Sequence, residues 1–528
     1  MIVSITRRRF LNLVGATGGS GAVYKAALGL GLVPSFASAV ERPDIAPLSK
    51  STRKVVILGA GIAGLTAAYE LGRKGYECTI LEASHRAGGR VLTLRHGDLI
   101  DEAGAPQRCT FDDEPHLFLN AGAARIPSTH NTLLDYCREL GVELIPFVNE
   151  NRNAYIQDDA AFGGKPVRNR EYMADARGFL AELAAKGLQA KVLDAPLTKA
   201  DQERLLEFAR AFGDLDGQHR YRGSIRAGAK SYDYTRPEEK LPFREFPELL
   251  DCNFWRIAMH FTEQPDQAPM MMEPVGGMDM VVRGFMKHVG ARVITHAVVE
   301  AVTLREKGVD VVYRHNGKRE KIAADFCLNN IPLHLMAGVE HNLPPSGAGC
   351  FTAVPRGKLL KIGLQARERF WERDGIYGGI SWTTQDITQI WYPSHGIHKR
   401  KGVLLAAYCF GGPAADKLEA MPHAERLELA IRQGEKIHPG YRRYIESGVS
   451  IAWHRMNHML GCAAEWTDEL REKWFAALQA PAGRHYMIGD QVSYHPGWQQ
   501  GAMHSALKAI SDIDRRVRAE SMTSGLLA

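Results

Sequence analysis

After residue 53, short apolar runs and a stretch of helical periodicity alternate along the chain. Lys54–Leu58 is apolar after its first residue, as is typical of a buried strand, and Ile62–Arg73 has the spacing of a helix. Cys78–Glu82 is a second run of strand length. The order strand, helix, strand predicts the opening of a doubly wound sheet with parallel strands.

Strand patterns return in the second half of the chain. The candidates are Arg292–Thr295, Val309–Tyr313, Ala324–Leu328 and His485–Ile488, with a turn at Gly308 among them. A helix rich in glycine and alanine is expected from about residue 500.

Helical patterns occupy much of the region before those strands. Residues 130–141 have amphipathic spacing that ends at Gly141. From about 151 to 240 the chain is polar and rich in Ala, Leu, Glu, Lys and Arg, and Ala174–Lys186 and Ala200–Phe212 have the pattern of surface helices. We therefore expect a helical insertion here.

Composition and charge narrow the range of functions. The chain has 528 residues, 45% hydrophobic and 24% charged, which is ordinary for globular proteins. The formal net charge is +6, but four positive charges lie in the first 39 residues, which contain no acid, so about +2 remains for the rest. This balance predicts neither nucleic acid nor an anionic membrane as a partner.

The eight cysteines form no C-x-x-C or zinc-like cluster, so we expect no metal site and interpret most of them as core residues.

The N-terminus has the pattern of a targeting segment. Thr6-Arg7-Arg8-Arg9-Phe10-Leu11-Asn12 precedes an apolar stretch that ends in Ala37-Ser38-Ala39. This resembles a twin-arginine export signal. The resemblance implies the twin-arginine translocase as a partner and delivery of folded protein to the periplasm or the medium. Lys25 interrupts the apolar stretch, which disfavours the alternative of a retained membrane anchor.

A glycine-rich turn follows the first strand. In Gly59-Ala60-Gly61-Ile62-Ala63-Gly64, the first glycine allows a tight turn, the second lets the backbone approach a pyrophosphate, and the third lets helix and strand pack closely. The phosphates would then meet the free N–H groups at the helix N-terminus. Glu82, 18 residues after Gly64, stands where an acidic side chain binds ribose hydroxyls, with Ala83 beside it. Together these features predict a dinucleotide site.

The dinucleotide is further specified by the residues that follow. Gly88-Gly89-Arg90 comes soon after the second strand, and the run Val55–Arg90 resembles the opening of the flavin amine oxidase family. The resemblance implies FAD, with the second glycine pair near the pyrophosphate and Arg90 holding the cofactor. It recurs at Gly489-Asp490 and at Pro496–Ala502, and implies that Asp490 approaches the ribitol side of the flavin. Val299 matches, more loosely, the segment that contacts adenine.

Within the family, the chain is most similar to L-amino acid oxidases. Asn120–Pro127 resembles the family segment whose arginine binds the substrate carboxylate, and that arginine is Arg125 in this chain. The planar guanidinium suits a carboxylate because it donates two parallel hydrogen bonds. Trp498, with Gly497 before it, resembles the aromatic residue that stands beside the reacting carbon. The alternative for Arg125 is a surface ion pair.

Two further residues carry this resemblance. Lys361 resembles the lysine that holds a water near flavin N5, and the alternation of Leu360, Ile362 and Leu364 places it on the other face of a strand. The alternative is an exposed strand lysine, as we expect of Lys358. Tyr408 resembles the tyrosine that shares the substrate carboxylate.

Two assignments stay open at this point. Tyr392 is a rival of Tyr408, because one extra residue precedes Tyr408 in this chain. Cys462 lies near the position where monoamine oxidases link a cysteine covalently to FAD. We interpret Cys462 as a packing residue and expect FAD to be bound without a covalent link.

These observations predict an α/β protein: a discontinuous Rossmann-like FAD-binding domain, a mixed α+β substrate domain and a helical insertion. The predicted order is a signal peptide (1–39), a linker (40–52), FAD-binding segments (53–115, 269–332, 455–520), substrate-domain segments (116–150, 241–268, 333–454) and the insertion (151–240).

The resemblance implies oxidative deamination of an L-amino acid, with hydride transfer from Cα to flavin N5 and production of a 2-oxo acid, ammonia and hydrogen peroxide from dioxygen. Three alternatives remain: a monoamine or polyamine oxidase, a dehydrogenase that passes electrons to a quinone, and a flavin-binding protein without catalysis. The sequence does not determine the oligomeric state, but the family commonly forms dimers, so a homodimer is one candidate assembly.

Overall fold

The computed structural model describes residues 42–45, 47–48, 53–190, 197–231, 233, 235–253 and 260–526, with side chains up to residue 522. Ile45–Ala528 form one compact unit, to which the elements below belong. The predicted export signal at 1–39 and most of the predicted linker at 40–52 lie outside the described residues. None of the described helices is long and apolar enough to cross a membrane.

A five-stranded parallel sheet forms the first domain. Its strands are β1 (Lys54–Leu58), β2 (Glu77–Leu81), β12 (Val293–Ile294), β16 (Phe326–Asn329) and β23 (His485–Met487), in the spatial order β12-β2-β1-β16-β23. The helix α2 (Ile62–Gly72) connects β1 to β2, which confirms the predicted strand–helix–strand opening. Because three distant segments supply the strands, the Rossmann-like domain is discontinuous.

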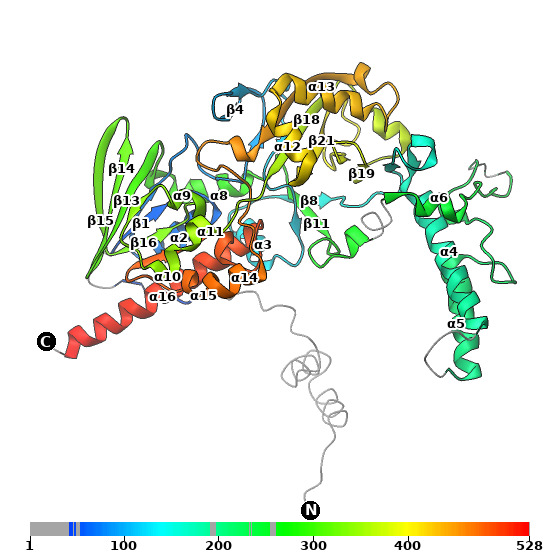
Figure 1. The fold of residues 1–528 in the computed structure, drawn as a ribbon. Helices are drawn as coiled ribbons and strands as arrows, with labels where there is room; N and C mark the ends of the chain where they lie inside the picture. Colours follow the sequence, from blue (N-terminus) through cyan, green and yellow to red (C-terminus); the bar gives the residue numbers. More distant parts are fainter. Residues whose placement is uncertain are drawn as a thin grey trace, which may run out of the picture. The chain divides into compact units, whose positions relative to one another are not determined.

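Both faces of this sheet are covered, which explains its uninterrupted apolar runs. Val55 and Ile57 pack into a core shared with the helices α2, α3 (Asn131–Glu139), α8 (Met280–Val289) and α16 (Gln499–Leu526). Val56 and Leu58 point the other way, into a core shared with β13 (Ala297–Arg305), β14 (Gly308–His315) and β15 (Lys318–Ala324). These three strands form an antiparallel layer, to which β17 (Glu340–His341) adds an edge strand (Figure 1).

One predicted strand is confirmed and another differs in detail from the structure. Val309–Tyr313 lies in the strand β14, which belongs to the antiparallel layer. Ala324–Leu328 was expected to be one strand, whereas β15 ends at Ala324 and β16 begins at Phe326. The break is at Asp325, whose carboxylate accepts the Lys54 backbone N–H at 2.8 Å. Asp325 therefore separates β15 of the antiparallel layer from β16 of the parallel sheet, and its hydrogen bond to Lys54 connects the start of β16 to the start of β1.

A mixed seven-stranded sheet forms the second domain. The spatial order is β10-β9-β19-β20-β21-β18-β22. The bounds are β9 (Tyr155–Gln157), β10 (Val167–Arg168), β18 (Leu359–Ala366), β19 (Ile380–Thr383), β20 (Gln389–Trp391), β21 (Gly402–Phe410) and β22 (Ile445–Ala452). The helices α12 (Gly412–Ala420) and α13 (His423–Gly434) cover one face, where they bury the alternate β18 residues Leu360, Ile362 and Leu364.

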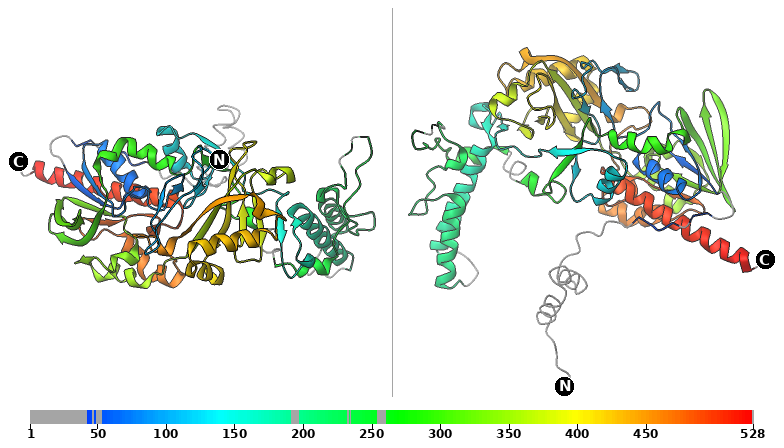
Figure 2. Two further views of the ribbon diagram at one scale, coloured as in Figure 1. Left: turned by 90° about the horizontal axis from the view of Figure 1, so that it is seen from above. Right: turned by 180° about the vertical axis from the view of Figure 1, so that it is seen from behind.

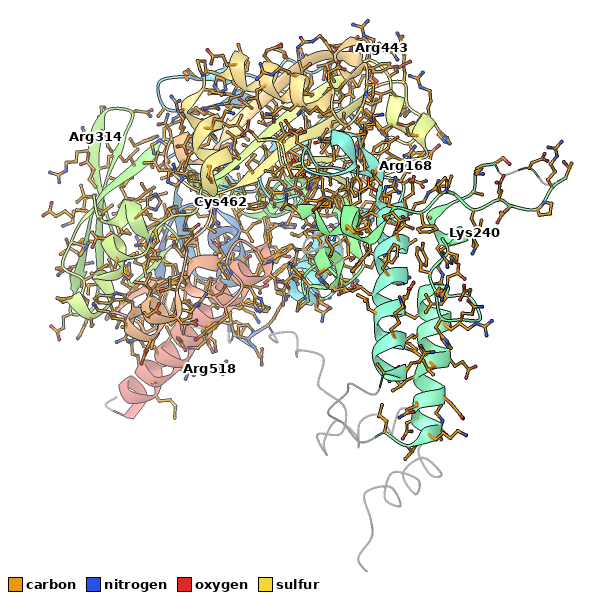
Figure 3. The ribbon with its side chains drawn as sticks, turned by 45° about the vertical axis from the view of Figure 1, so that its right-hand side comes forward. Arg168, Lys240, Arg314, Arg443, Cys462 and Arg518 are labelled. Atoms are coloured by element: carbon orange, nitrogen blue, oxygen red, sulfur yellow. The ribbon has the colours of Figure 1, made fainter. Side chains whose placement is uncertain are left out.

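Two long helices lie in the predicted insertion. They are α4 (Asn169–Gln189) and α5 (Lys199–Gly213), which pack together through small residues such as Ala181, Ala185 and Ala209. Figure 3 shows the two helices side by side, and both views of Figure 2 show this region away from the parallel sheet. The predicted segment 151–240 begins with β9 and β10, which belong to the seven-stranded sheet, so the helical part starts later than predicted.

Short elements connect these parts. They are β3 (Thr93–Leu94), β4 (Leu99–Ile100), β5 (Gln107–Arg108), β6 (Leu119–Asn120), β7 (Ile126–Pro127), β8 (Leu144–Phe147), α6 (Phe246–Leu250), β11 (Met271–Pro274), α9 (Leu333–Met336), α10 (Pro345–Ala348), α11 (Cys350–Ala353), α14 (Asp468–Leu470) and α15 (Ala476–Gln479). Seven of the eight cysteines are buried and Cys462 is half-buried, which confirms that most are core residues.

Candidate functional site

One cavity of about 800 Å³ runs from the carboxyl ends of the parallel strands to the second domain. Its wall includes Gly59, Gly61 and Glu82 at one end, and Arg125 and Tyr408 at the other. The volume lies in the usual range for ligand sites, roughly 300–1,000 Å³. The residues predicted to bind nucleotide and those predicted to bind substrate therefore share one space.

The two glycine-rich turns form a close-packed cradle. Gly59 has φ +95°, a left-handed conformation that favours glycine, and a Cβ on Gly64 would lie 2.2 Å from the Gly59 carbonyl oxygen. The Gly88 N–H donates to the Ala60 carbonyl at 2.8 Å, which joins the second turn to the first. Because Ile62 and Ala63 line the cavity, the N-terminus of α2 faces it. This backbone geometry fits a pyrophosphate.

Glu82 lies at the end of β2 and is held in place by backbone groups. One carboxylate oxygen accepts the Ala60 N–H at 2.7 Å and the other accepts the Ser84 N–H at 2.9 Å. Ala83 and Val299 line the same end of the cavity. This arrangement fits the ribose and adenine of a dinucleotide.

Arg90 and Asp490 bind each other across the cavity wall, although they are 400 residues apart in sequence. Arg90 donates to both carboxylate oxygens, with one bond of 3.0 Å, and Asp490 also accepts the Gly497 N–H at 2.7 Å. Burial alone would lower the pKa of Arg90, but the paired Asp490 outweighs it and raises the pKa. Gly489, which precedes Asp490, has φ +107° and packs against Asn330.

Arg125 is held at the other end of the cavity by an amide and two aromatic rings. Its guanidinium donates to Gln267 at 2.6 Å and stacks on the Trp391 ring, 4.5 Å from the ring centroid, with the Phe261 ring at 6.0 Å. Nε has no hydrogen-bond partner, and no described carboxylate forms an ion pair with Arg125. Burial lowers the pKa of Arg125 to about 10, so the group remains a cation at neutral pH.

The structure distinguishes between the two candidate tyrosines. Tyr408 on β21 lines the cavity with Arg125. Tyr392 lies in another core, where its hydroxyl hydrogen-bonds to His438 at 2.6 Å and to Ser381 at 2.7 Å. Only Tyr408 is therefore placed to meet a ligand of Arg125.

Lys361 is fully buried one layer behind the cavity wall. Its ammonium donates to the carbonyls of Asn120 at 3.0 Å and Gly122 at 2.6 Å, and lies 4.3 Å from the Tyr408 ring centroid. Burial first, and then Arg125, lower the pKa of Lys361 to about 7. The alternative of an exposed lysine is wrong for Lys361. Its neighbour Lys358 is half-buried just before β18, lines the cavity and pairs with Asp416 at 2.7 Å.

Trp498 and Gly497 complete the wall beside the N-terminus of α16. The Trp498 ring meets His130 edge-on, with the centroids 4.9 Å apart. Burial, followed by His495 and His504, lowers the pKa of His130 to about 4, so its imidazole is neutral. This part of the cavity is aromatic and uncharged.

Sequence patterns missed several residues of the site. Gln267 and His130 line the cavity, and Arg356 lies buried close to Arg90 and Asp490. No local pattern marks them, because each lies outside the recognised motifs. Cys462, labelled in Figure 3, is on the cavity wall and not only in the core. In the described residues, no group of three or more His, Cys, Asp or Glu could hold a metal ion.

The comparisons with known proteins agree with this geometry. Residues 62–513 match the family model described as "Flavin containing amine oxidoreductase". The flavin-dependent L-tryptophan oxidase RebO of Lentzea aerocolonigenes is 28% identical over 507 residues, which cover 88% of this chain and 99% of that protein. The L-amino-acid oxidase of Siganus canaliculatus is 27% identical over 90% of this chain and 87% of its own. A triple mutant of putrescine oxidase has the same fold, with a TM-score of 0.59 and 17% identity over 88% of this chain and 99% of its own.

Proposed function

The chain belongs to the family of flavin-containing amine oxidoreductases, and we propose that it is an L-amino acid oxidase. Its cofactor is FAD, which the glycine cradle, Glu82 and the cavity volume fit. The observation that carries the proposal is Arg125, a cation without an acidic partner in the described residues, in the same cavity as the FAD site. The L-tryptophan and L-amino acid oxidases among its relatives support the same choice.

The carboxylate of the substrate would bind Arg125. Gln267 accepts a hydrogen bond from one terminal nitrogen of the guanidinium, and the Arg125 side chain lines the cavity, where it can meet a ligand. A carboxylate that leaves water needs a paired cation, and a planar guanidinium offers two parallel hydrogen bonds. The Tyr408 hydroxyl would share the same carboxylate.

The rest of the cavity wall would orient the reacting carbon of the substrate and exclude water from it. Trp498 and His130 place an aromatic, uncharged surface beside the substrate, which excludes water. Lys361 fixes the carbonyls of Asn120 and Gly122, and so holds the segment that leads to Arg125. When bound, FAD supplies a two-electron acceptor. Overall, the amino acid loses two electrons and two protons to dioxygen, which becomes hydrogen peroxide, and water hydrolyses the imino acid to a 2-oxo acid and ammonia.

The test compares one amino acid with the amine that lacks its carboxylate. In Arg125→Ala, kcat/KM for the amino acid should fall by about 10²-fold or more, since charge-assisted hydrogen bonds contribute roughly 1.5–3 kcal/mol each. Arg125→Lys keeps the charge but loses the planar fork, so it should recover only part of this loss. Tyr408→Phe should show the same selectivity with a smaller loss.

The amine is the internal control, because it has no carboxylate to bind. Equal losses on both substrates would point to damaged folding, and unchanged amino acid kinetics in Arg125→Ala would contradict the proposal. A wild-type enzyme that oxidises only amines would be an amine oxidase. One that yields little hydrogen peroxide per dioxygen consumed would be a dehydrogenase.

We also propose that the protein is exported after folding, through the twin-arginine translocase. The support is the N-terminal pattern around Arg7 and Arg8, which resembles the signal of a route that exports folded proteins.

A further inference from the structure

The groups that hold Arg125 in the cavity are all uncharged. Gln267 accepts a hydrogen bond from its terminal nitrogen Nη2 at 2.6 Å, and the guanidinium lies over the Trp391 ring, 4.5 Å from the ring centroid. Within the described residues, no carboxylate acts on this arginine. A cation removed from water is normally paired with an acid, so the choice of neutral partners calls for a physical reason.

Gln267 meets Arg125 with its amide oxygen and is fixed in that orientation by Asn149. The side-chain N–H of Asn149 donates to the same oxygen at 3.4 Å and to the backbone carbonyl of Gln267 at 3.3 Å. Arginine can only donate, and Asn149 donates here too, so the atom between them must be an acceptor. Gln267 is therefore a fixed acceptor without charge.

The small sheet β7-β11-β8 brings these three residues together. Arg125 directly precedes β7, Asn149 follows β8 and Gln267 precedes β11. Because β8 and β11 pair antiparallel, with Phe147 opposite Met271, Asn149 and Gln267 leave the sheet at the same end. Gln267 lines the cavity together with Arg125, so the contact belongs to the substrate end of the site.

The aromatic side of this arrangement is fixed by neutral groups as well. The indole N–H of Trp391 donates to the Gln389 side chain at 2.7 Å, and the Gln389 amide donates to the Tyr408 carbonyl at 2.8 Å. The Trp391 and Tyr408 rings meet edge-on, with their centroids 5.1 Å apart. A ring face attracts a guanidinium without contributing a negative charge. Arg125 is thus held in position while its charge stays available.

The neutrality of residue 267 decides how strongly Arg125 can attract a ligand. Glutamine and glutamate have nearly the same shape, and either could accept the hydrogen bond from Arg125. A carboxylate at position 267 would also neutralise the arginine and repel a second carboxylate that entered the cavity. Specificity can come from such a repulsive element as much as from an attractive one.

We infer that Gln267 is a specificity-determining residue, which positions Arg125 for a ligand carboxylate and leaves the charge of the arginine free for it. The inference rests on the proposed function, in which Arg125 binds the substrate carboxylate. Selectivity for amino acids over amines then depends on the neutrality of Gln267 as well as on the charge of Arg125.

The first test measures carboxylate binding to the purified holoenzyme without turnover. The probe is benzoate, which has no amine to oxidise, and benzamide is its uncharged counterpart; both are titrated through the visible spectrum of the bound flavin. In Gln267→Glu, the dissociation constant of benzoate should rise by about 10-fold or more, the scale of one charge-assisted hydrogen bond. The affinity for benzamide should change little. Benzoate that binds the wild type no better than benzamide would overturn the inference.

The order of two variants separates the effect of charge from simple positioning. Gln267→Met loses the hydrogen bond but adds no charge, so it should weaken benzoate binding less than Gln267→Glu does. If Gln267 acted only by its shape and hydrogen bond, the order would be reversed, and that result would contradict the inference. The matched control is Gln264→Glu, which adds the same charge to an exposed side chain of the same segment and should leave benzoate affinity unchanged.

Kinetics then connect this residue to the reaction. With one amino acid and its decarboxylated amine as substrates, Gln267→Glu should lower kcat/KM for the amino acid by about 10-fold or more and leave the amine unaffected. Equal losses on both substrates would overturn the inference. A wild-type enzyme that oxidises only amines would contradict the proposed function, and the benzoate series would still show whether Gln267 leaves the charge of Arg125 free.

Discussion

At the scale of single residues, Lys361 shows how tertiary position changes the chemistry of an ordinary side chain. It is fully buried, between two carbonyls and the Tyr408 ring, and no described carboxylate pairs with it. Burial first, and then Arg125, lower its pKa to about 7 from the usual 10.5. Its charge is therefore present below about pH 7 and is lost as the pH rises through that value.

This leads to a prediction for Lys361→Met. We expect slower reoxidation of the enzyme or slower release of the 2-oxo acid, with little change in the dissociation constant of the substrate during reduction. In the wild type, the step that depends on the charge should slow as the pH rises through about 7, and this dependence should vanish in the variant. Stopped-flow traces across this pH range measure both. A raised substrate dissociation constant with normal reoxidation would show that Lys361 only positions the segment before Arg125.

Cys462 supports a second prediction at this scale. Burial raises the pKa of its thiol, although Arg90 and Arg356 act against that rise, so the group is less nucleophilic than a thiolate. We expect FAD to be released into solution when the purified yellow protein is precipitated with acid. If the colour stays in the pellet of the wild type and leaves it in Cys462→Ala, a covalent link exists.

At the scale of elements, the β1–α2–β2 unit depends on how closely helix and strand approach. Gly64 lies on the first turn of α2, and a Cβ there would meet the Gly59 carbonyl oxygen at 2.2 Å and a methyl group of Ile57 at 3.2 Å. The two glycines thus bring the helix N-terminus close to the cavity. The motif acts through backbone proximity, not through side-chain chemistry.

Gly64→Ala should therefore lower the melting temperature and the FAD content of the purified protein, because the added methyl must push α2 away from β1. The ratio of flavin absorbance to protein absorbance measures the content. Gly217→Ala is the matched control, since a Cβ at Gly217 has nothing within 4 Å. Full FAD content in Gly64→Ala would show that the helix N-terminus can shift without loss of the cofactor.

At the scale of the whole molecule, the site exists only because distant segments meet. Arg90 binds Asp490, Lys361 binds Asn120 and Gly122, and the indole N–H of Trp453 donates to Ala121 at 3.0 Å. The last two contacts join the segment before Arg125 to β18 and to the end of β22. FAD and substrate sites should consequently lose their function together when the domains unfold.

The export proposal gives a prediction at the same scale. Replacing Arg7 and Arg8 by lysine keeps the charge but removes the paired arginines of the signal. Active, yellow protein should then accumulate in the cytoplasm, because folding and FAD binding precede export. Fractionation with an activity assay measures this. Continued delivery of the double variant to the periplasm would contradict the assignment.

The sequence by itself determined the strand–helix–strand opening of the parallel sheet, the first glycine-rich turn and the acid at the end of β2. These features are local: an apolar run, a glycine that permits a left-handed turn and a carboxylate at a strand end lie within about thirty residues, so their geometry follows from short-range sterics. The family resemblance added Arg125, Tyr408 and Trp498, which the structure brings into one cavity.

Only the tertiary structure decided which charges are already paired. Asp490 binds Arg90, Arg125 has no acidic partner among the described residues, and Tyr392 belongs to another core. Each of these facts depends on side chains from distant segments. An ionisable group is tuned by burial and by neighbours within a few ångströms, and folding selects those neighbours from the whole chain.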